Sequence, residues 1–271
     1  MKYTIAIDQS TSATKAMLFD ENGQLIARTS EDHRQYYPQP GFVEHDAVEI
    51  LENTYKAVQR LVQNHISGSD EIKSIAITNQ RETVVVWDKR TGKPVYNAVV
   101  WQCNRGTQIC EELIAQGHEP MVTDKTGLII NPYFSASGVK WILDNVENAR
   151  EAAENGHLLL GTMDCWLIWN LTGGKIHATD YTNASRTLLF NIHTLDWDQE
   201  LMDLFTIPAS MLPQALASDD IYGSTTFDGL IPEVPIAGVL GDSHGALAGQ
   251  MCFTSGMGKA TYGTGSSIMI N

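Results

Sequence analysis

The feature that most constrains the fold is an apolar-rich run at residues 72–78, followed at once by Asn79, Gln80, Arg81 and Glu82. A near-continuous apolar run of this length is typical of a β-strand that is buried on both faces. The run therefore predicts an interior strand of a sheet that carries an arginine and a glutamate side by side at its end.

Arg81 and Glu82 are complementary in hydrogen bonding. A guanidinium group offers fixed donors and no acceptor, while a carboxylate offers acceptors and no donor. Side by side, the two groups can bind one hydroxyl as an acceptor and its neighbour as a donor, which is what a polyol requires. The alternative is a salt bridge at a strand end, and most surface pairs of this kind contribute little. The rest of the chain decides between the two interpretations.

The bulk composition narrows the class of protein. The chain has 271 residues, enough for one large or two medium domains, and a net charge of −14 from 18 basic and 32 acidic residues. This balance argues against a nucleic-acid or anionic-membrane binder, which would show a basic footprint. It is compatible with a nucleotide ligand, because backbone amides and a metal ion commonly hold phosphates.

The cysteines and the apolar segments predict where the protein resides. The four cysteines include no C-x-x-C spacing, which argues against zinc, and their spread is typical of reduced thiols in a cytosolic protein. No stretch approaches the ~18 uninterrupted apolar residues of a membrane span. We therefore expect a soluble, cytoplasmic protein without a membrane or nucleic-acid partner; the sequence leaves open whether it forms a homo-oligomer.

Strands and helices alternate through the chain. A helix is expected over residues 47–66, because Asp46 can cap it and Glu49 can complete a capping box. The other expected strands span residues 3–7, 13–19, 24–30, 84–87, 94–101 and 235–240, and the other expected helices 104–116, 137–146, 201–205 and 243–250.

The final segment predicts the start of a further unit. Two strands flank residues 263–265, and a two-stranded hairpin alone is only marginally stable. We therefore expect one domain over residues 1–250 and the beginning of a second over 251–271, so that the chain is the front part of a longer protein. The alternative is a complete protein whose last hairpin joins the main sheet.

A first group of candidate functional residues follows the first expected strand. The strand delivers Asp8 to a tight turn of hydroxyl residues at 10–12, and Lys15 follows. Backbone amides and hydroxyls in such a turn can hold phosphate oxygens. The Asp8 carboxylate can hold Mg²⁺, usually through water. No G-x-x-x-x-G-K-S/T motif occurs, so this is not a P-loop, and an ordinary hairpin turn is the alternative.

A second candidate functional residue is Asp242, which lies between an expected strand and an expected helix of small residues. Near a helix N-terminus an anionic side chain is favoured by about 0.3–1 kcal/mol. An ionised aspartate in a cleft is a good general base for a hydroxyl; a simple helix cap is the alternative.

Two aromatic residues are further candidates. Tyr133 follows a proline that can aim its hydroxyl, and Trp101 can cover the carbon face of a polyol. Both aromatic residues are equally compatible with plain core packing.

Together these segments resemble the FGGY carbohydrate-kinase family, in particular its glycerol-phosphorylating members, from about residue 3 to residue 271. The likeness is strongest at residues 78–83, 97–103, 126–144 and 161–197. The resemblance implies an α/β fold, namely an actin-like (ribonuclease-H-like) ATPase domain with a mixed sheet flanked by helices, the first of two such domains. It also implies ATP in the cleft between the domains, Mg²⁺, and transfer of the γ-phosphoryl group to glycerol to give glycerol 3-phosphate.

The resemblance also implies roles for individual residues. Asp242 is implied to be the general base, and Asp8 to hold the metal. Polyol binding falls on residues from several segments: Arg81, Glu82, Trp101, Tyr133, Asp242 and Ser243. Phosphate and ATP binding fall on the two glycine- or hydroxyl-rich turns: Asp8, Thr11, Ser12, Lys15, Thr264 and Gly265.

Departures from the family pattern bear on specificity. Ser10 stands where the family has a glycine, and Lys15 where it has an arginine, which weakens close, bidentate phosphate contact. Ser243 stands for a glutamine and Ser267 for a phenylalanine, so the far end of the pocket should be roomier and more polar. A kinase for a larger polyol or sugar, and a non-catalytic polyol-binding half-enzyme, remain as alternatives.

Overall fold

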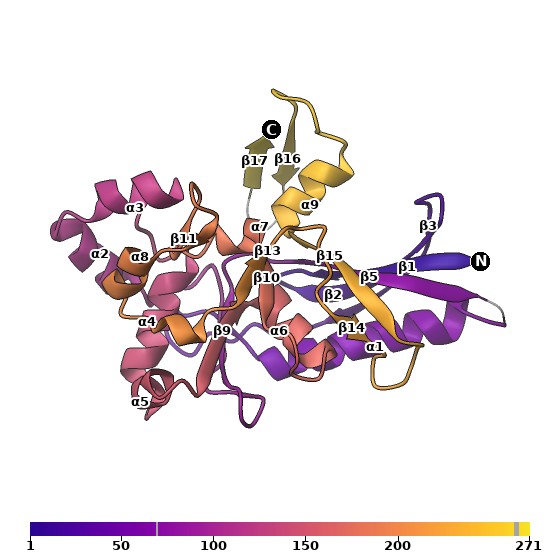
Figure 1. Cartoon of the computed structure of the whole chain (residues 1–271), viewed down its shortest axis with the longest axis horizontal. Helices are drawn as coiled ribbons and strands as arrows, with labels where there is room; N and C mark the ends of the chain where they lie inside the picture. The colour runs from indigo at the N-terminus through magenta and orange to yellow at the C-terminus, as the bar shows by residue number, and fades with distance from the viewer. Residues whose placement is uncertain (69, 263–265) are drawn as a thin grey trace.

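A six-stranded mixed sheet forms the centre of the molecule (Figure 1). The computed structural model describes residues 1–68, 70–262 and 266–271. The first three strands of the sheet are antiparallel, and two further strands extend it in parallel. This arrangement is the mixed, actin-like sheet expected from the sequence. In sheet order the strands are β14 (Ser224–Thr225), β15 (Val234–Gly241), β5 (Glu71–Asn79), β1 (Lys2–Gln9), β2 (Ala13–Asp20) and β3 (Leu25–Asp32).

Helix α1 (Ala47–His65) begins as predicted but with half of the expected capping box. The Asp46 carboxylate accepts the N–H groups of Val48 and Glu49 at 2.8 and 3.2 Å. Among the described residues, Glu49 does not return a bond to Asp46, because its carboxylate accepts the Arg34 N–H at 3.2 Å. The predicted cap by Asp46 is confirmed, and the predicted reciprocal bond from Glu49 was wrong.

The main core lies between α1 and the sheet. Ile50, Val58 and Leu61, on one face of α1, are fully buried against β1, β2 and β3. Ile5 and Ile7 of β1 are also fully buried, while their neighbours in the strand are half-buried. Burying these side chains contributes about 1.5–3 kcal/mol each and fixes the register of the strand whose end carries the site.

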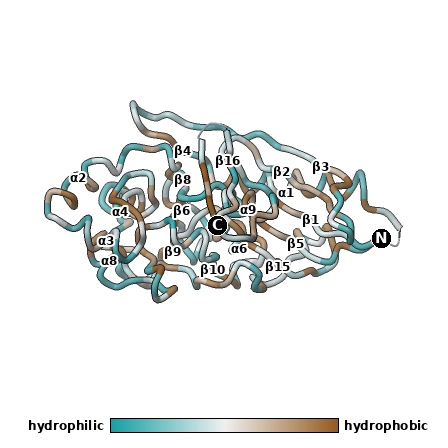
Figure 2. The backbone as a smooth tube through the Cα atoms, turned by 90° about the horizontal axis from the view of Figure 1, so that it is seen from above, coloured by the Kyte–Doolittle hydropathy of each residue, from teal (hydrophilic) through white to brown (hydrophobic). Residues whose placement is uncertain are grey.

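A second sheet and a helical lobe adjoin the first. Figure 2 places α2, α3, α4 and α8 at the end of the molecule opposite the N-terminus. These helices share a core with β6, where Val84 and Val86 pack against Val139 and Ile142. The strands of this sheet are β4 (Glu44–His45), β8 (Ala98–Val99), β6 (Val84–Asp88), β7 (Lys93–Pro94) and β9 (Leu158–Thr162).

The expected strand at residues 94–101 was wrong. The structure has only the short strands β7 and β8 there. Between them, the Tyr96 hydroxyl and the Asn97 amide donate to the buried Glu44 carboxylate at 2.7 and 2.9 Å. These bonds pull the chain out of the pairing that a longer strand would need.

The remaining helical segments are α2 (Thr107–Ala115), α3 (Glu119–Thr126), α4 (Ser135–Asn145), α5 (Ala149–Glu154), α6 (Met163–Leu171), α7 (Tyr181–Ala184), α8 (Gln199–Leu204), η1 (Ala209–Met211) and α9 (Asp242–Gly249).

The last hairpin stands beside α9, apart from the main sheet (Figure 1). Its strands pair with each other in a sheet of their own.

Across residues 1–68, 70–262 and 266–271, no helix combines the length and the apolar character that a membrane span requires. The two-stranded sheets are β10 (Ala178–Asp180) with β13 (Gln214–Leu216), β11 (Phe190–Asn191) with β12 (Asp196–Trp197), and β16 (Gly258–Tyr262) with β17 (Ser266–Ile270).

Candidate active site

Three parallel strand ends meet at one edge of the main sheet. Gln9 of β1 and Gly241 of β15 both pair with Asn79 of β5. In open α/β sheets, ligands bind in the crevice outside the carboxyl ends of the strands. This register brings Arg81, two residues past β5, beside Asp242, one residue past β15, although they are far apart in sequence.

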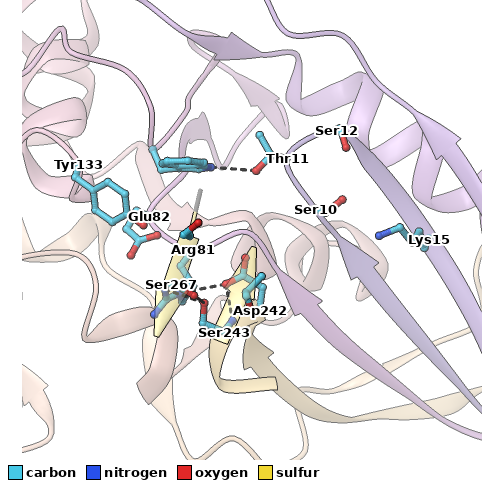
Figure 3. Close-up of a pocket in the computed structure, with 13 residues that line it drawn as sticks. Ser10, Thr11, Ser12, Lys15, Arg81, Glu82, Tyr133, Asp242, Ser243 and Ser267 are labelled. Atoms are coloured by element: carbon cyan, nitrogen blue, oxygen red, sulfur yellow. Dashed lines mark hydrogen bonds and ion pairs between the residues drawn. The ribbon is translucent and has the colours of Figure 1, made fainter. Parts of the chain in front are cut away.

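An open cavity of about 480 Å³ lies at this edge, and Figure 3 shows side chains from several segments facing it. It is lined by ten predicted residues from the body of the domain, by Ser267, which the sequence also singled out, and by Thr261 and Ser266 of the last hairpin. Asp8 is not among its lining residues, and the predicted Thr264 and Gly265 lie outside the described residues. The ten residues are Ser10, Thr11, Ser12, Lys15, Arg81, Glu82, Trp101, Tyr133, Asp242 and Ser243.

Arg81 fixes the orientation of Asp242. The Arg81 Nε–H donates to Asp242 Oδ1 at 3.2 Å, and the Ser243 backbone N–H donates to the same oxygen at 2.6 Å. Within the described part of the chain, Asp242 Oδ2 accepts no hydrogen bond. The Asp242 side chain is 46% exposed while that of Arg81 is 9% exposed. One carboxylate oxygen is therefore anchored, and the other is available to take a proton from a group in the cavity.

Gly241 makes room for Arg81. A Cβ at this glycine would lie 2.6 Å from Arg81 Cδ and 2.7 Å from Arg81 Cγ. Its φ of −58° is an ordinary value, so glycine is required here by the close approach of the arginine stem. Asp242 is the first residue of α9 and not its N-cap, which is Gly241. Its carboxylate nevertheless accepts the Ser243 N–H in the first turn, so the side chain also satisfies a donor at the start of the helix.

Glu82 is held at the bottom of the cavity in a strained conformation. Its φ is +64°, which is uncommon for a residue with a side chain. The Ser135 hydroxyl donates to its carbonyl at 2.8 Å, and the Arg186 Nε–H donates to its carboxylate at 2.6 Å. Burial raises the pKa of the Glu82 carboxyl, and the positive charges of Arg81 and Arg186 partly offset that rise. Two arginines thus lie beside a 3% exposed carboxylate that can accept a hydrogen bond from a hydroxyl.

The analysis of the sequence missed Arg186. The residue lies within 161–197, a segment that carries the family resemblance, but it follows no strand and no motif marks it. Besides binding Glu82, its guanidinium carbon lies 4.9 Å from the Phe134 ring centre and 5.9 Å from that of Tyr133. Its role depends on how the segment after α7 packs, which local sequence does not reveal.

Trp101 and Tyr133 form one wall of the cavity. Their ring centres are 5.6 Å apart in an edge-to-face arrangement, and the Trp101 Nε1–H donates to the Thr11 hydroxyl at 3.0 Å. Both rings are half-buried and face the cavity, so they are not plain core residues. Burial, reinforced by nearby Glu82, raises the pKa of the Tyr133 phenol, which therefore keeps its proton at neutral pH.

The turn after β1 forms the opposite end of the cavity. The Lys15 ammonium donates to Asp8 Oδ2 at 3.0 Å, across the β1–β2 pair. The Ser10 hydroxyl bonds to the Ala13 carbonyl at 2.8 Å and so stabilises the turn itself. The described residues contain no cluster of three metal-ligating side chains. A lone carboxylate such as Asp8 fits Mg²⁺, which is commonly held by one or two carboxylates, water and substrate phosphates.

A buried network supports the Gly241–Asp242 corner. The Thr182 hydroxyl accepts the Gly241 N–H at 2.8 Å and donates to Asp180 Oδ2 at 2.6 Å. The Ser218 hydroxyl donates to the same Asp180 oxygen at 2.7 Å. Since Asp180 is fully buried, this network fixes the backbone directly before Asp242. The sequence analysis did not identify it, because its members come from separate elements.

Lys259 is a buried cation in strand β16 of the last hairpin. It is 3% exposed and donates to the Thr261 and Ser267 hydroxyls at 2.8 and 2.9 Å. Burial lowers the pKa of its ammonium group, and the charge of Asp242 partly offsets this. Nothing in the local sequence distinguished Lys259 from a surface lysine.

Residues 3–249 match the model of the N-terminal domain of the FGGY family of carbohydrate kinases. The chain belongs to this family. It is 52% identical to glycerol kinase 2 and 54% identical to glycerol kinase 1 of Thermotoga maritima, over 100% and 99% of this chain and 55% of each relative. The crystal structure of Plasmodium falciparum glycerol kinase with ADP superposes with a TM-score of 0.96 at 38% identity, covering 100% of this chain and 54% of that one.

These similarities confirm the predicted family and the actin-like fold. The chain spans about half the length of the curated relatives that it matches. The two Thermotoga relatives and the Plasmodium structure cover essentially the whole of it, so the likeness includes the cavity and the hairpin that borders it.

Proposed function

We propose that the protein containing this chain transfers the γ-phosphoryl group of ATP to a terminal hydroxyl of glycerol, with Mg²⁺, to give glycerol 3-phosphate. The observation that carries the proposal is the Arg81–Asp242 pair, in which one carboxylate oxygen is anchored and the other faces a polar cavity. The glycerol kinases among its relatives supply the reaction.

The residues of this chain would act mainly by positioning the acceptor. Arg81 can donate a hydrogen bond to one hydroxyl while Glu82 accepts a hydrogen bond from its neighbour. Trp101 would cover the carbon chain, and Tyr133 would add a hydroxyl contact. Asp242 Oδ2 would take the proton of the reactive hydroxyl as its oxygen attacks phosphorus.

The turn at residues 10–12 and Lys15 would bind the phosphate groups, since they line the same cavity from the opposite side. When bound, Mg·ATP supplies the phosphoryl group and the metal charge that stabilises it; Asp8 would hold the metal through water. We propose that residues 1–250 form the substrate-binding domain, that residues 251–271 begin a second domain contributing to nucleotide binding through Thr264 and Gly265, and that the protein is cytoplasmic.

ADP release by the protein at its full cellular length tests the proposal. We expect release from Mg·ATP to require glycerol. Asp242→Asn should lower kcat by about 10²–10⁴-fold, the usual contribution of a general base. Asp219→Asn is the matched control, because Asp219 is an exposed aspartate that does not line the cavity.

Two outcomes would contradict the proposal. Equal ADP release with and without any acceptor would show a simple ATPase. Glycerol binding without ADP release would favour a non-catalytic polyol-binding protein.

A further inference from the structure

A second hollow adjoins the cavity. This hollow of about 500 Å³ shares Arg81, Tyr133 and Ser267 with the first cavity. Arg186 and His244 line it together with apolar side chains: Leu128, Ile192, Ile268 and Met269. The shared residues therefore lie between two adjoining spaces, and the size of their side chains limits how far a ligand can extend from one into the other.

The side chains that separate the two spaces are small at Ser267. Figure 3 shows Ser243 and Ser267 beside Arg81 and Asp242. The two serine hydroxyls lie 3.5 Å apart, Lys259 donates to that of Ser267, and Arg81 donates to that of Ser243 at 3.1 Å. Both side chains are small, so the residues that the structure describes place no bulky group between the two spaces at this point. The boundary is also polar, because the Ser267 hydroxyl accepts a hydrogen bond from Lys259 and the Ser243 hydroxyl accepts one from Arg81.

The second hollow offers polar groups for hydroxyls as well as apolar side chains for a carbon chain. Arg186 brings a guanidinium group to it, which is a donor. Burial, with the nearby charges of Arg81, Arg186 and Lys259, lowers the pKa of His244 to about 4. A neutral imidazole offers one donor and one acceptor. Hydrocarbon placed among such groups would cost hydrogen bonds, whereas a chain of hydroxyls can satisfy them.

We propose that, besides glycerol, the site accepts linear polyols of four or five carbons, whose distal carbons pass Ser267 into the second hollow. This inference rests on the proposed kinase function and names the substrate class of the same site. The reactive hydroxyl lies at Asp242 and the next hydroxyls at Arg81 and Glu82, while the distal hydroxyls meet Arg186 and the polar wall at Ser267.

A substrate panel with position-267 variants tests the inference on the protein at its full cellular length. We expect turnover of erythritol, or of a five-carbon polyol such as ribitol or xylitol, besides that of glycerol. Ser267→Phe should lower the ratio of longer-polyol to glycerol kcat/KM at least tenfold, because pocket volume differences of this kind are worth about 10–200-fold. Ser267→Ala, which removes the hydroxyl without adding volume, should lower the ratio by only about threefold. Activity with glycerol alone, or an unchanged ratio in Ser267→Phe, would overturn the inference.

Calorimetric binding of the same polyols without ATP separates this inference from the proposed function. Binding of longer polyols besides glycerol, with Ser267→Phe weakening them selectively, supports it even if no acceptor is phosphorylated. Glycerol turnover without binding of longer polyols would overturn it while leaving the kinase proposal intact. If Ser267→Phe lacks a cooperative melting transition, the smaller Ser267→Val should shift the ratio in the same direction, and no shift would overturn the inference.

Discussion

Replacing Arg186 by methionine removes the cation that holds Glu82 at the bottom of the cavity. The Arg186 Nε–H lies 2.6 Å from the Glu82 carboxylate, and the Glu82 residue is 3% exposed. Methionine keeps an apolar stem that can still pack near Phe134 but offers no donor. The substitution therefore isolates the charge and the hydrogen bond of Arg186.

The size of the effect follows from this contact. A hydrogen bond to a charged group contributes about 1.5–3 kcal/mol, which corresponds to about 10–150-fold in acceptor kcat/KM. Burial already raises the pKa of Glu82, and Arg186 is one of two cations that offset it. Losing a nearby opposite charge raises a carboxyl pKa by about 1–3 units. In the proposed role of Glu82, acceptor binding requires its ionised form, so the fall of kcat/KM on acidification should begin at a higher pH in Arg186→Met.

The assay is acceptor kcat/KM against pH at saturating Mg·ATP. Arg186→Lys keeps a positive charge and should restore part of the shift. Arg150→Met is the matched control, because Arg150 pairs with Asp144 at the surface, away from the cavity. An acid limb that stays in place in Arg186→Met, or that moves equally in Arg150→Met, would refute the reasoning.

Two further predictions concern groups behind the cavity. Thr182→Val leaves the Gly241 N–H without its acceptor, so kcat should fall about tenfold with acceptor KM nearly unchanged, and Thr182→Ser should restore it; equal loss in both variants would contradict this positioning role. His45 is fully buried and burial lowers its pKa to about 3, so the unfolded chain binds more protons between pH 3 and 6.5. The free energy of unfolding from urea titrations should therefore lose about 3 kcal/mol through His45 as pH falls from 6.5 to 4, and His45→Gln should flatten that slope; identical slopes would exclude His45 as the cause.

The sequence predicted the parts of the site that follow directly from strand ends. The apolar run before Asn79 became β5, which lies between β1 and β15. Because these strands are parallel and in register, Arg81 and Asp242 had to lie at the same edge. The roles assigned to them remain predictions, and their proximity depends on the strand order β15–β5–β1, which was not predicted from the sequence.

The remaining contacts could not be predicted because they depend on long-range packing. Arg186 reaches Glu82 from the segment after α7, and Thr182 reaches Gly241 from α7 itself. The expected strand at residues 94–101 was wrong for the same reason, since Glu44 captures Tyr96 and Asn97 from a distant part of the chain. A local propensity does not include such competing partners.

The close contact at Gly241 links two positions in the evolution of this site. The Arg81 stem occupies the space of a side chain at position 241, and its far end is anchored by Asp242 and Ser243. The arginine therefore cannot swing aside to admit even a methyl group. Alanine at position 241 becomes acceptable only after the arginine has been lost, so the order in which the two residues can change is fixed. A lineage that keeps the arginine must also keep the glycine, whatever happens to the acceptor that it binds.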